Sequence, residues 1–298
     1  LNVLDNHVGM EGIRSREDLA RIKALVAGAS TRLLALQADD PLVLAMAGDR
    51  DPSSLALVSE QPGSAAWHAH RSAGHRAVLY SREQGGCITL HERGEQTLSI
   101  ALREIPASDD GVIGSLAAAA AFTAALASGL GLAPAQIDAG LRGFGLKPAH
   151  RRGRFEILMR EPWQVVLCWA DGHEATASLA RYALTASAAQ GRRRLLLCSA
   201  PDSRPDDYLR RMGQATRGFD LVICGAWEER RGRPLHEVPA LLAEGVRSLG
   251  SEAPQALQSG TEQEAVSVLA EQIRPGDFCV VCSFDSLRMR QWLLQALS

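Results

Sequence analysis

The chain has 298 residues, about twice the length of a typical domain, so we expect two domains. Hydrophobic residues make up 46% and charged residues 22%, which is typical of an ordinary globular protein. The formal net charge of −2 gives no general attraction to nucleic acid or to an anionic membrane. No apolar run approaches the roughly 20 residues that span a bilayer. We therefore expect no nucleic-acid or membrane partner and, without a signal peptide, a cytoplasmic protein.

The first half of the chain is expected to begin with a helix at 16–29, followed by a strand and by a turn, ADDP, at 38–41. Gly- and Glu-rich turns separate the later strands, and Pro134 suits the first turn of a helix. The expected strands are 32–37, 54–60, 75–81, 86–92 and 96–105, and the later helices are 115–130 and 134–144.

The second half, from near residue 150, alternates apolar runs with amphipathic segments. EILMREPWQVVLCWA predicts two strands joined at Glu161-Pro162. Later strands are expected at 192–200, 220–226 and 277–284, and helices at 175–190, 206–218, 237–250, 262–273 and 286–297. This alternation predicts a parallel sheet covered on both faces, which is a Rossmann-like α/β domain. No GxGxxG follows a strand, so a nicotinamide dinucleotide is not expected.

Six cysteines are spread thinly, mostly inside apolar runs such as LLLCSA and DLVICGA. Such runs predict buried strands, so we expect reduced core thiols rather than a disulfide framework. Cys279 and Cys282 form a CxxC pair, but FCVVCSF is typical of a strand. No second cysteine or histidine pair lies at zinc spacing, so we expect no metal there.

The chain begins LNVLDNHVGMEG, without an initiator Met. Asp5, Asn6 and His7 lie in a predicted loop, and their side chains can hold a metal or a phosphate-bound cation. A loop at the first residues has no preceding element to position it. We therefore expect a missing N-terminal region.

Five segments, in the same order, resemble the Mur-type amide ligases, and most closely the Mur-like half of the cyanophycin synthetases. The loop DNHVG and the helix that carries Lys23 are similar to a family loop and its lysine-bearing helix. LALQADDPLV resembles the family's LNADDPLV, and HRRGRFEIL resembles its PGRFEV. The other two segments are AWHAHRSAGHRAVLYS and APDSRPDDYLRRMGQATRGFD.

This resemblance implies an α/β protein in which 1–148 is the C-terminal part of a Mur-ligase central, ATP-binding domain. Residues 149–298 would be the Rossmann-like C-terminal domain of such a ligase. The implied activity is ATP-dependent amide bond formation, in which a carboxylate is activated as an acyl phosphate and attacked by an amine. The implied cofactors are ATP and Mg²⁺, because phosphoryl transfer depends on positioning and on charge neutralisation.

The same resemblance assigns roles to individual residues. They are Lys23 and Arg154 in catalysis, Asp39, Asp40, Asp171 and Arg204 in cofactor binding, and His7 as a metal ligand. Taken alone, His7 is also typical of a solvated loop histidine and Lys23 of a solvated helix face. The ADDP segment would form a type I turn without any ligand.

Several family motifs are altered or absent. The phosphate loop GxxGKT does not occur in the chain, so no cradle for the β- and γ-phosphates is expected in it. DYAHNP is replaced by CWADGH, with Cys168 at the aspartate and Gly172 at an asparagine. HNxxNALAAA is replaced by DGVIGSLAAA, with Gly111 and Gly114 at asparagines. Because a thiol removes an acceptor for ribose, we expect Cys168→Asp to restore nucleotide affinity.

Two hypotheses are compatible with the sequence. In the first, the chain is the C-terminal part of an active ligase whose phosphate loop lies upstream. In the second, the Mur-like half has lost its activity and is a structural or oligomerising module beside an upstream ATP-grasp domain. The expected partners are an amino-acid or peptide substrate, the missing N-terminal region and, if the chain forms a homo-oligomer, further copies of itself.

Overall fold

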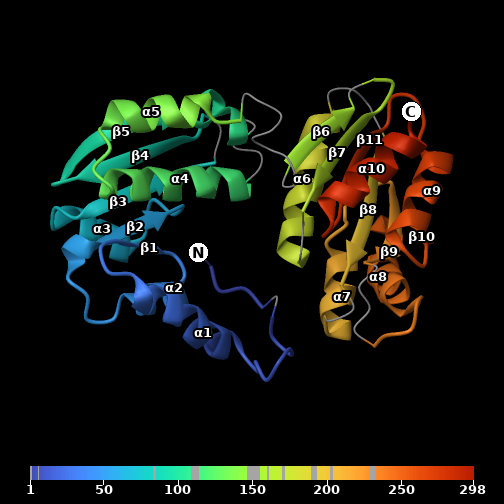
Figure 1. Cartoon of the computed structure of the whole chain (residues 1–298), viewed down its shortest axis with the longest axis horizontal. Coiled ribbons are helices and arrows are strands. Elements are labelled where there is room, and N and C mark those ends of the chain that lie inside the picture. Colours follow the sequence, from blue (N-terminus) through green and yellow to red (C-terminus); the bar gives the residue numbers. More distant parts are fainter. Residues whose placement is uncertain are drawn as a thin grey trace. The chain divides into compact units, whose positions relative to one another are not determined.

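The computed structural model of the chain describes residues 2–5, 7–82, 85–108, 114–145, 155–159, 161–169, 172–188, 193–201, 204–227 and 232–298 (Figure 1). The chain divides into two compact units, Leu1–His150 and Arg151–Ser298, and the structure describes one sheet in each. No helix among the described residues is long and apolar enough to cross a membrane.

The first unit is built on a five-stranded sheet in the order β1-β2-β3-β4-β5. β1 to β3 are parallel, and β4 and β5 continue the sheet as antiparallel strands. The strands are β1 Leu34–Gln37, β2 Leu55–Ser59, β3 Arg76–Tyr80, β4 Cys87–Glu92 and β5 Glu95–Ala101. The helices are α1 Arg16–Ala29, α2 Pro41–Leu44, α3 Ala65–Ser72, α4 Gly114–Gly129 and α5 Pro134–Gly143.

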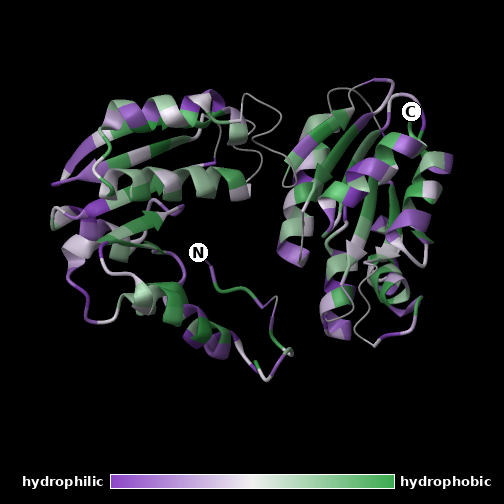
Figure 2. Cartoon of the chain, viewed as in Figure 1, coloured by the Kyte–Doolittle hydropathy of each residue, from purple (hydrophilic) through white to green (hydrophobic). Residues whose placement is uncertain are grey.

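Alternating side chains of β1 to β3 divide this unit into two apolar cores. Ala35 and Val78 pack in one core with Ala121 of the Ala-rich helix α4. Leu36 and Leu57 pack in the other core, with residues of α1, α2 and α3. The parallel strands are therefore covered on both faces, as their continuous apolar runs require. Figure 2 shows the apolar residues concentrated on the strands of both sheets.

Helix α3 differs from the sequence-based expectation, which assigned no helix there. Its 8 residues are too few to show a clear helical period of apolar side chains. Trp67 is 1% exposed, and its indole Nε1 donates a hydrogen bond to the Val78 carbonyl at 2.9 Å. Packing on β3 therefore stabilises this helix more than its local sequence does.

The second unit contains a six-stranded sheet in the order β10-β9-β8-β11-β7-β6. The strands are β6 Phe155–Met159, β7 Gln164–Cys168, β8 Arg194–Ala200, β9 Leu221–Ala226, β10 Gln255–Gln258 and β11 Phe278–Cys282. The helices are α6 His173–Ala188, α7 Asp206–Gln214, α8 Glu237–Arg247, α9 Glu262–Gln272 and α10 Ser286–Ala296. α9 and α10 pack on one face of the sheet, and Figure 1 shows α6 and α7 on the other side.

The predicted Rossmann-like α/β fold of this unit is confirmed, with two differences in detail. β6 is antiparallel to β7, because the short connection between them can join only antiparallel neighbours. β10 was not expected, because its four residues begin and end with glutamine and show no hydrophobic pattern of a strand. Its side chains are correspondingly exposed or only partly buried. The predicted strand around Cys279 and Cys282 is confirmed as β11.

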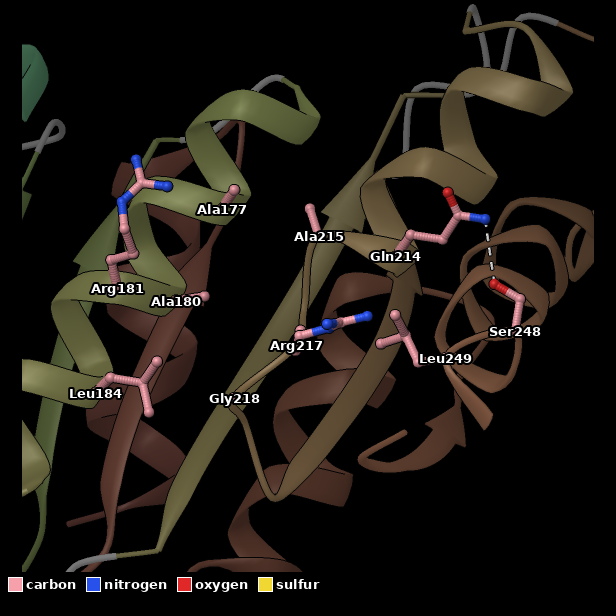
Figure 3. Close-up of a pocket in the computed structure, with 10 residues that line it drawn as sticks. All are labelled: Ala177, Ala180, Arg181, Leu184, Gln214, Ala215, Arg217, Gly218, Ser248 and Leu249. Carbon is pink, nitrogen blue, oxygen red and sulfur yellow. Dashed lines mark hydrogen bonds between the residues drawn. The ribbon is translucent and has the colours of Figure 1, made fainter. Parts of the chain in front are cut away.

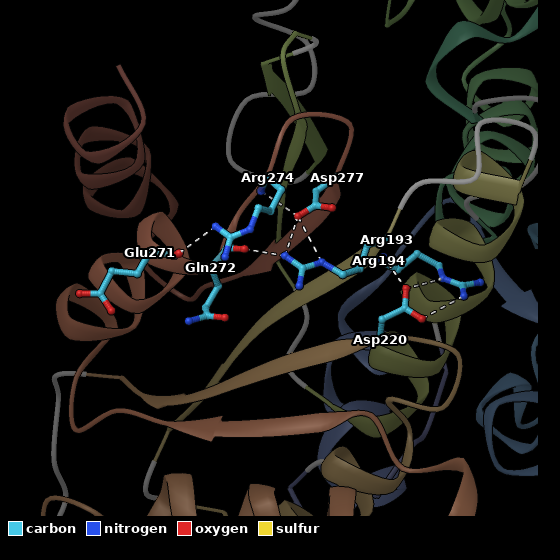
Figure 4. Close-up of polar contacts among 7 residues, drawn as sticks. All are labelled: Arg193, Arg194, Asp220, Glu271, Gln272, Arg274 and Asp277. Carbon is cyan, nitrogen blue, oxygen red and sulfur yellow. Dashed lines mark hydrogen bonds and ion pairs between the residues drawn. The ribbon is translucent and has the colours of Figure 1, made fainter.

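A network of ion pairs holds the amino ends of β8, β9 and β11 together (Figure 4). Asp277 is 5% exposed and accepts hydrogen bonds from the Arg193 guanidinium and from the main-chain N of Arg274, both at 2.8 Å. Arg194 pairs with Asp220 at 3.3 Å. These arginines therefore fasten the amino ends of the parallel strands, at the edge opposite to the carboxyl ends.

Two histidines of the first unit are shielded from water. His91 is 5% exposed and packs edge-on against Trp67, with 5.5 Å between the ring centroids. Burial lowers the pKa of His91, and the positive charge of Arg71 lowers it further. Burial and the neighbouring His75 likewise lower the pKa of His70. The folded unit therefore keeps these imidazoles neutral at a pH at which the unfolded chain protonates them.

We expect the first unit to lose stability as the pH falls below about 6.5, the ordinary histidine pKa. Above that pH both states leave these imidazoles neutral, and below it the unfolded state binds more protons. Urea unfolding between about pH 7.5 and about 5.5, followed by hydrogen exchange in β3 and β4, measures the effect. His91→Gln should flatten the dependence, whereas His68→Gln at an exposed position of α3 should not. Equal slopes in all three proteins would contradict this explanation.

The predicted domain boundary between residues 148 and 149 lies outside the described residues and stays a prediction. Because each unit has its own core, we expect limited trypsin digestion to cut after Arg151 or Arg152 and to leave a protected C-terminal fragment. Mass spectrometry of the fragments is the measurement. A protected fragment that starts within the second sheet would argue against this boundary.

Candidate functional site

The parallel strands of the first unit end at one edge of their sheet, and charged side chains follow each of them. Asp39 follows β1, Glu60 follows β2 and Arg82 follows β3. In open α/β sheets, ligands bind outside the carboxyl ends of the parallel strands. This carboxyl edge is therefore the candidate site of the first unit.

Asp39 joins the ends of β1 and β2. Its carboxylate accepts hydrogen bonds from the Gln37 amide at 2.9 Å, the Ser59 hydroxyl at 2.5 Å and the main-chain N of Glu60 at 2.7 Å. Three donors orient this carboxylate and occupy most of its acceptor capacity. Asp39 thus braces the edge of the sheet, and the cofactor-binding role predicted for it stays a prediction.

Asp40 holds the N-terminal segment near the same edge. Its carboxylate caps α2 by accepting a hydrogen bond from the main-chain N of Leu42 at 3.1 Å, and it accepts another from Val3 at 3.1 Å. Arg16 lies 3.9 Å from this carboxylate, and its Nε donates to the Val3 carbonyl at 2.9 Å. The expected turn is therefore the start of a short helix, with Pro41 in its first turn. The cofactor-binding role predicted for Asp40 also stays a prediction.

The N-terminal segment carries His7, and Lys23 fastens this segment to α1. The Lys23 ammonium donates a hydrogen bond to the Asn2 carbonyl at 2.8 Å. His7 is half-buried in a turn, where its carbonyl accepts a hydrogen bond from the main-chain N of Met10 at 3.2 Å. Lys23 and Asp40 therefore position the segment that bears His7. The catalytic role of Lys23 and the metal-binding role of His7 stay predictions.

The described residues of the first unit do not assemble a ligand set for Mg²⁺. No three carboxylate, imidazole or thiol ligand atoms of these residues lie close enough to share an ion within this unit. Mg²⁺ requires oxygen ligands in near-octahedral geometry, whereas the carboxylates of Asp39 and Asp40 already accept protein hydrogen bonds. The imidazole of His7 is a nitrogen ligand, which suits transition metals better.

Three residues that the sequence analysis missed form a connected group at the same edge. Glu60 accepts a hydrogen bond from the Tyr80 hydroxyl at 3.1 Å through one oxygen, and its other oxygen pairs with Arg82. Burial, followed by the charge of Glu60, raises the pKa of Tyr80, so its hydroxyl stays protonated and donates. The signal in the sequence was positional, since these three residues lie at or just beyond the ends of the predicted strands 54–60 and 75–81.

In the second unit, Arg204 follows β8 and is 4% exposed. Its guanidinium lies over the Tyr208 ring, 5.5 Å from the centroid, and that of Arg211 lies over the same ring at 5.3 Å. The Arg204 carbonyl accepts a hydrogen bond from Arg233 at 2.8 Å. These contacts fix the chain after β8, and the cofactor-binding role predicted for Arg204 stays a prediction.

Tyr208 also fills the space beside Gly172. A Cβ at position 172 would lie 2.2 Å from the Tyr208 hydroxyl oxygen, so a larger residue there requires Tyr208 to move. Asp171, which precedes Gly172 in the sequence, and Arg154 are predicted site residues that lie outside the described residues.

Cys168 belongs to a row of four buried thiols. Cys168, Cys282, Cys198 and Cys224 are register partners across β7, β11, β8 and β9. Each is at most 1% exposed, and the Sγ atoms of Cys168 and Cys282 lie 4.0 Å apart. Burial raises the pKa of the Cys198 and Cys224 thiols well above the ordinary value, so they stay neutral. All six cysteines are free, as the sequence predicted.

An open groove of about 660 Å³ lies between α6 and the C-terminal ends of α7 and α8 (Figure 3). Arg181 and Leu184 of α6 line one side, and Gln214 on the other side donates a hydrogen bond to the Ser248 hydroxyl at 3.1 Å. None of the predicted site residues that the structure describes lines this groove. The groove is therefore separate from Arg204, the described candidate that follows β8.

Comparison with known sequences finds relatives of one kind, although no family model matches the chain. Cyanophycin synthetase from Crocosphaera subtropica is 27% identical over 289 residues, which cover 94% of this chain and 32% of that protein. Cyanophycin synthetase from Trichormus variabilis is 26% identical over 256 residues, or 85% of this chain and 28% of that protein. The chain thus spans about a third of the length of the curated relatives it matches.

Several solved structures that resemble the chain are ligases or synthases. The pseudomurein peptide ligase type C from Methanothermus fervidus matches 100% of this chain and 62% of its own, with a TM-score of 0.65 and 12% identity. The UDP-N-acetylmuramate–alanine ligase from Thermotoga maritima matches 95% of this chain and 55% of its own, with a TM-score of 0.57 and 15% identity. The folylpolyglutamate synthase from Mycobacterium tuberculosis, complexed with ADP and AMPPCP, matches 96% of this chain and 61% of its own, with a TM-score of 0.51 and 16% identity.

The chain therefore has the α/β fold of the Mur-type ligases, with part of a central domain followed by a Rossmann-like C-terminal domain. Within that class, its sequence is similar to one particular group, the cyanophycin synthetases, over nearly the whole chain. The predicted resemblance to the Mur-like half of these proteins is confirmed.

The burial of Cys168 argues against the expectation that an aspartate there restores nucleotide affinity. We expect Cys168→Asp to destabilise the second unit by about 4 kcal/mol at pH 7, because a carboxyl with an ordinary pKa of about 3.9 has to stay neutral there. Cys168→Ala, which adds no charge, should cost much less. Urea unfolding of both variants is the measurement. If Cys168→Asp is as stable as the parent and binds Mg·ATP more tightly, the original expectation is correct.

Proposed function

We propose that the chain is part of an ATP-dependent carboxylate–amine ligase that forms an amide bond through an acyl phosphate. The observation that carries this proposal is the similarity to cyanophycin synthetase over 94% of the chain. The structural likeness to folylpolyglutamate synthase, which was solved with ADP and AMPPCP, supports ATP as the phosphoryl donor. The proposed partners are an amino-acid or peptide substrate and a polypeptide region that supplies the phosphate loop. Association between copies of the chain is a further proposal.

The proposed reaction has two steps. A carboxylate oxygen of the substrate attacks the γ-phosphorus of ATP, and ADP leaves, which gives the acyl phosphate. The amine nitrogen then attacks the acyl carbon, inorganic phosphate leaves and the nitrogen loses a proton. Both steps gather negative charge on phosphoryl oxygens, so the protein has to supply cations and donors in fixed positions.

The first unit would supply this fixed environment at its carboxyl edge. Lys23 and Asp40 would position the N-terminal segment that bears His7, and Asp39 would hold the ends of β1 and β2 together. In the second unit, Arg154 would keep the proposed catalytic role, and Asp171 and Arg204 the proposed cofactor-binding role. Mg²⁺ would neutralise phosphate charge, but the described residues of the first unit do not form its ligand set, and no step is assigned to it.

A structural or oligomerising module beside an upstream catalytic domain is the second candidate. The observation that favours it is the close approach of the Tyr208 hydroxyl to Gly172, where a Cβ would lie 2.2 Å away. Together with the buried thiol of Cys168, this closes the part of the second unit in which the resemblance places nucleotide contacts. The two candidates differ in whether His7 and Lys23 affect amide formation.

The test joins the part of the Crocosphaera subtropica relative that precedes its matched region to Leu1 of this chain. We expect amino-acid-dependent ADP release and amide product from this chimaera, and a fall of about 100-fold in His7→Ala and Lys23→Ala, the scale of losing one electrostatic stabiliser. Arg21→Ala is the matched control, because it removes an exposed cation from the same helix. Unchanged rates in His7→Ala and Lys23→Ala would assign the chemistry to the upstream region and favour the structural module.

A further inference from the structure

Arg82 lies at the carboxyl ends of β2 and β3 and pairs with Glu60. The sequence analysis assigned no role to this arginine. Its Nε donates to Glu60, and the side chains of Arg82 and Glu60 are each 34% exposed. The other oxygen of Glu60 accepts the Tyr80 hydroxyl at 3.1 Å, and Tyr80 is 4% exposed. A buried hydroxyl thus orients a carboxylate, and the carboxylate orients a guanidinium that still reaches solvent.

Gly114, the first residue of α4, restrains the same guanidinium from a second direction. A Cβ at position 114 would lie 2.3 Å from one Nη of Arg82 and 3.0 Å from its Cζ. The guanidinium therefore packs on bare backbone, and a side chain at position 114 would displace it. Contact with Glu60 on one side and Gly114 on another leaves Arg82 little freedom.

Asp39, the other carboxylate at this edge, does not compete with a ligand for the Arg82 guanidinium. Asp39 accepts hydrogen bonds from Gln37, Ser59 and the main chain of Glu60, so its acceptor capacity is largely used. An ordinary surface ion pair would require neither the buried Tyr80 nor the absent Cβ at position 114, and it would contribute little to stability. The arrangement is better explained as a guanidinium held ready for a ligand.

We propose that Arg82 binds an oxyanion of the substrate, a phosphoryl or carboxylate group, at the carboxyl edge of the first sheet, and that Glu60, Tyr80 and Gly114 position it. This inference rests on the proposed function, which brings both kinds of oxyanion to this edge. The guanidinium presents N–H donors in a planar fork that matches phosphate and carboxylate oxygens. Its Nε is used by Glu60, so the ligand would meet the Nη groups.

The test is isothermal titration of the whole 298-residue chain with inorganic phosphate and, separately, with acetate. We expect millimolar binding of at least one anion, and Arg82→Gln should weaken it at least about tenfold, the loss of one charged hydrogen bond. Gly114→Ala should weaken binding without removing the charge, and Arg82→Lys should recover only part of it. Arg32→Gln, an exposed arginine that precedes β1 at the amino edge, is the matched control and should bind as the parent does.

Loss of phosphate binding alone would assign a phosphoryl subsite to Arg82, and loss of acetate binding alone a carboxylate subsite. The proposal is overturned if the parent binds neither anion, or if Arg82→Gln binds both as tightly as Arg32→Gln. Loss of binding in Arg82→Gln together with an inactive chimaera would reject the proposed function and keep the assignment of Arg82. An active chimaera whose KM does not change on Arg82→Gln would reject Arg82 and keep the proposed function.

Discussion

Parallel pairing of buried strands is the constraint on which the rest of this structure depends. β1 to β3 in the first unit and β7 to β11 in the second are joined by helical crossovers, so all their carboxyl ends lie at one edge of each sheet. Backbone hydrogen bonds are satisfied within the sheet, and apolar side chains fill both faces. Polar residues are therefore concentrated where the strands end, and the candidate site follows from the topology.

At the carboxyl edge of the first sheet, charged side chains mainly bind other parts of the protein. Asp39 and Asp40, two adjacent carboxylates, accept hydrogen bonds from a neighbouring strand end and from the N-terminal segment respectively. Carboxylates held in this way are poor candidates for direct ligation but good candidates for fixing a shape. A pre-formed edge costs little reorganisation when a charged ligand binds, which is what electrostatic catalysis requires.

The two units differ in which side chain fills the space beside a glycine near the carboxyl edge of the sheet. At Gly114 the missing side chain accommodates a guanidinium that remains partly exposed, whereas at Gly172 it accommodates the hydroxyl of the buried Tyr208. The row of buried thiols that includes Cys168 makes the carboxyl edge of the second sheet less polar still. The first unit thus keeps a charged, accessible edge, while the described part of the second is filled by its own side chains.

The sequence by itself determined the elements and the fold class, because those depend on local patterns. The capping box formed by Ser15 and Asp18 and the apolar period after it define α1 at its expected limits, and the continuous apolar runs define the parallel strands. The row of thiols and the group of Tyr80, Glu60 and Arg82 could not be predicted in this way. Both arise from the register of strands that are distant in sequence. The second also depends on Gly114, which approaches Arg82 only in the folded chain. Tertiary structure decided them because register and close approach are properties of packed pairs, and no local pattern encodes them.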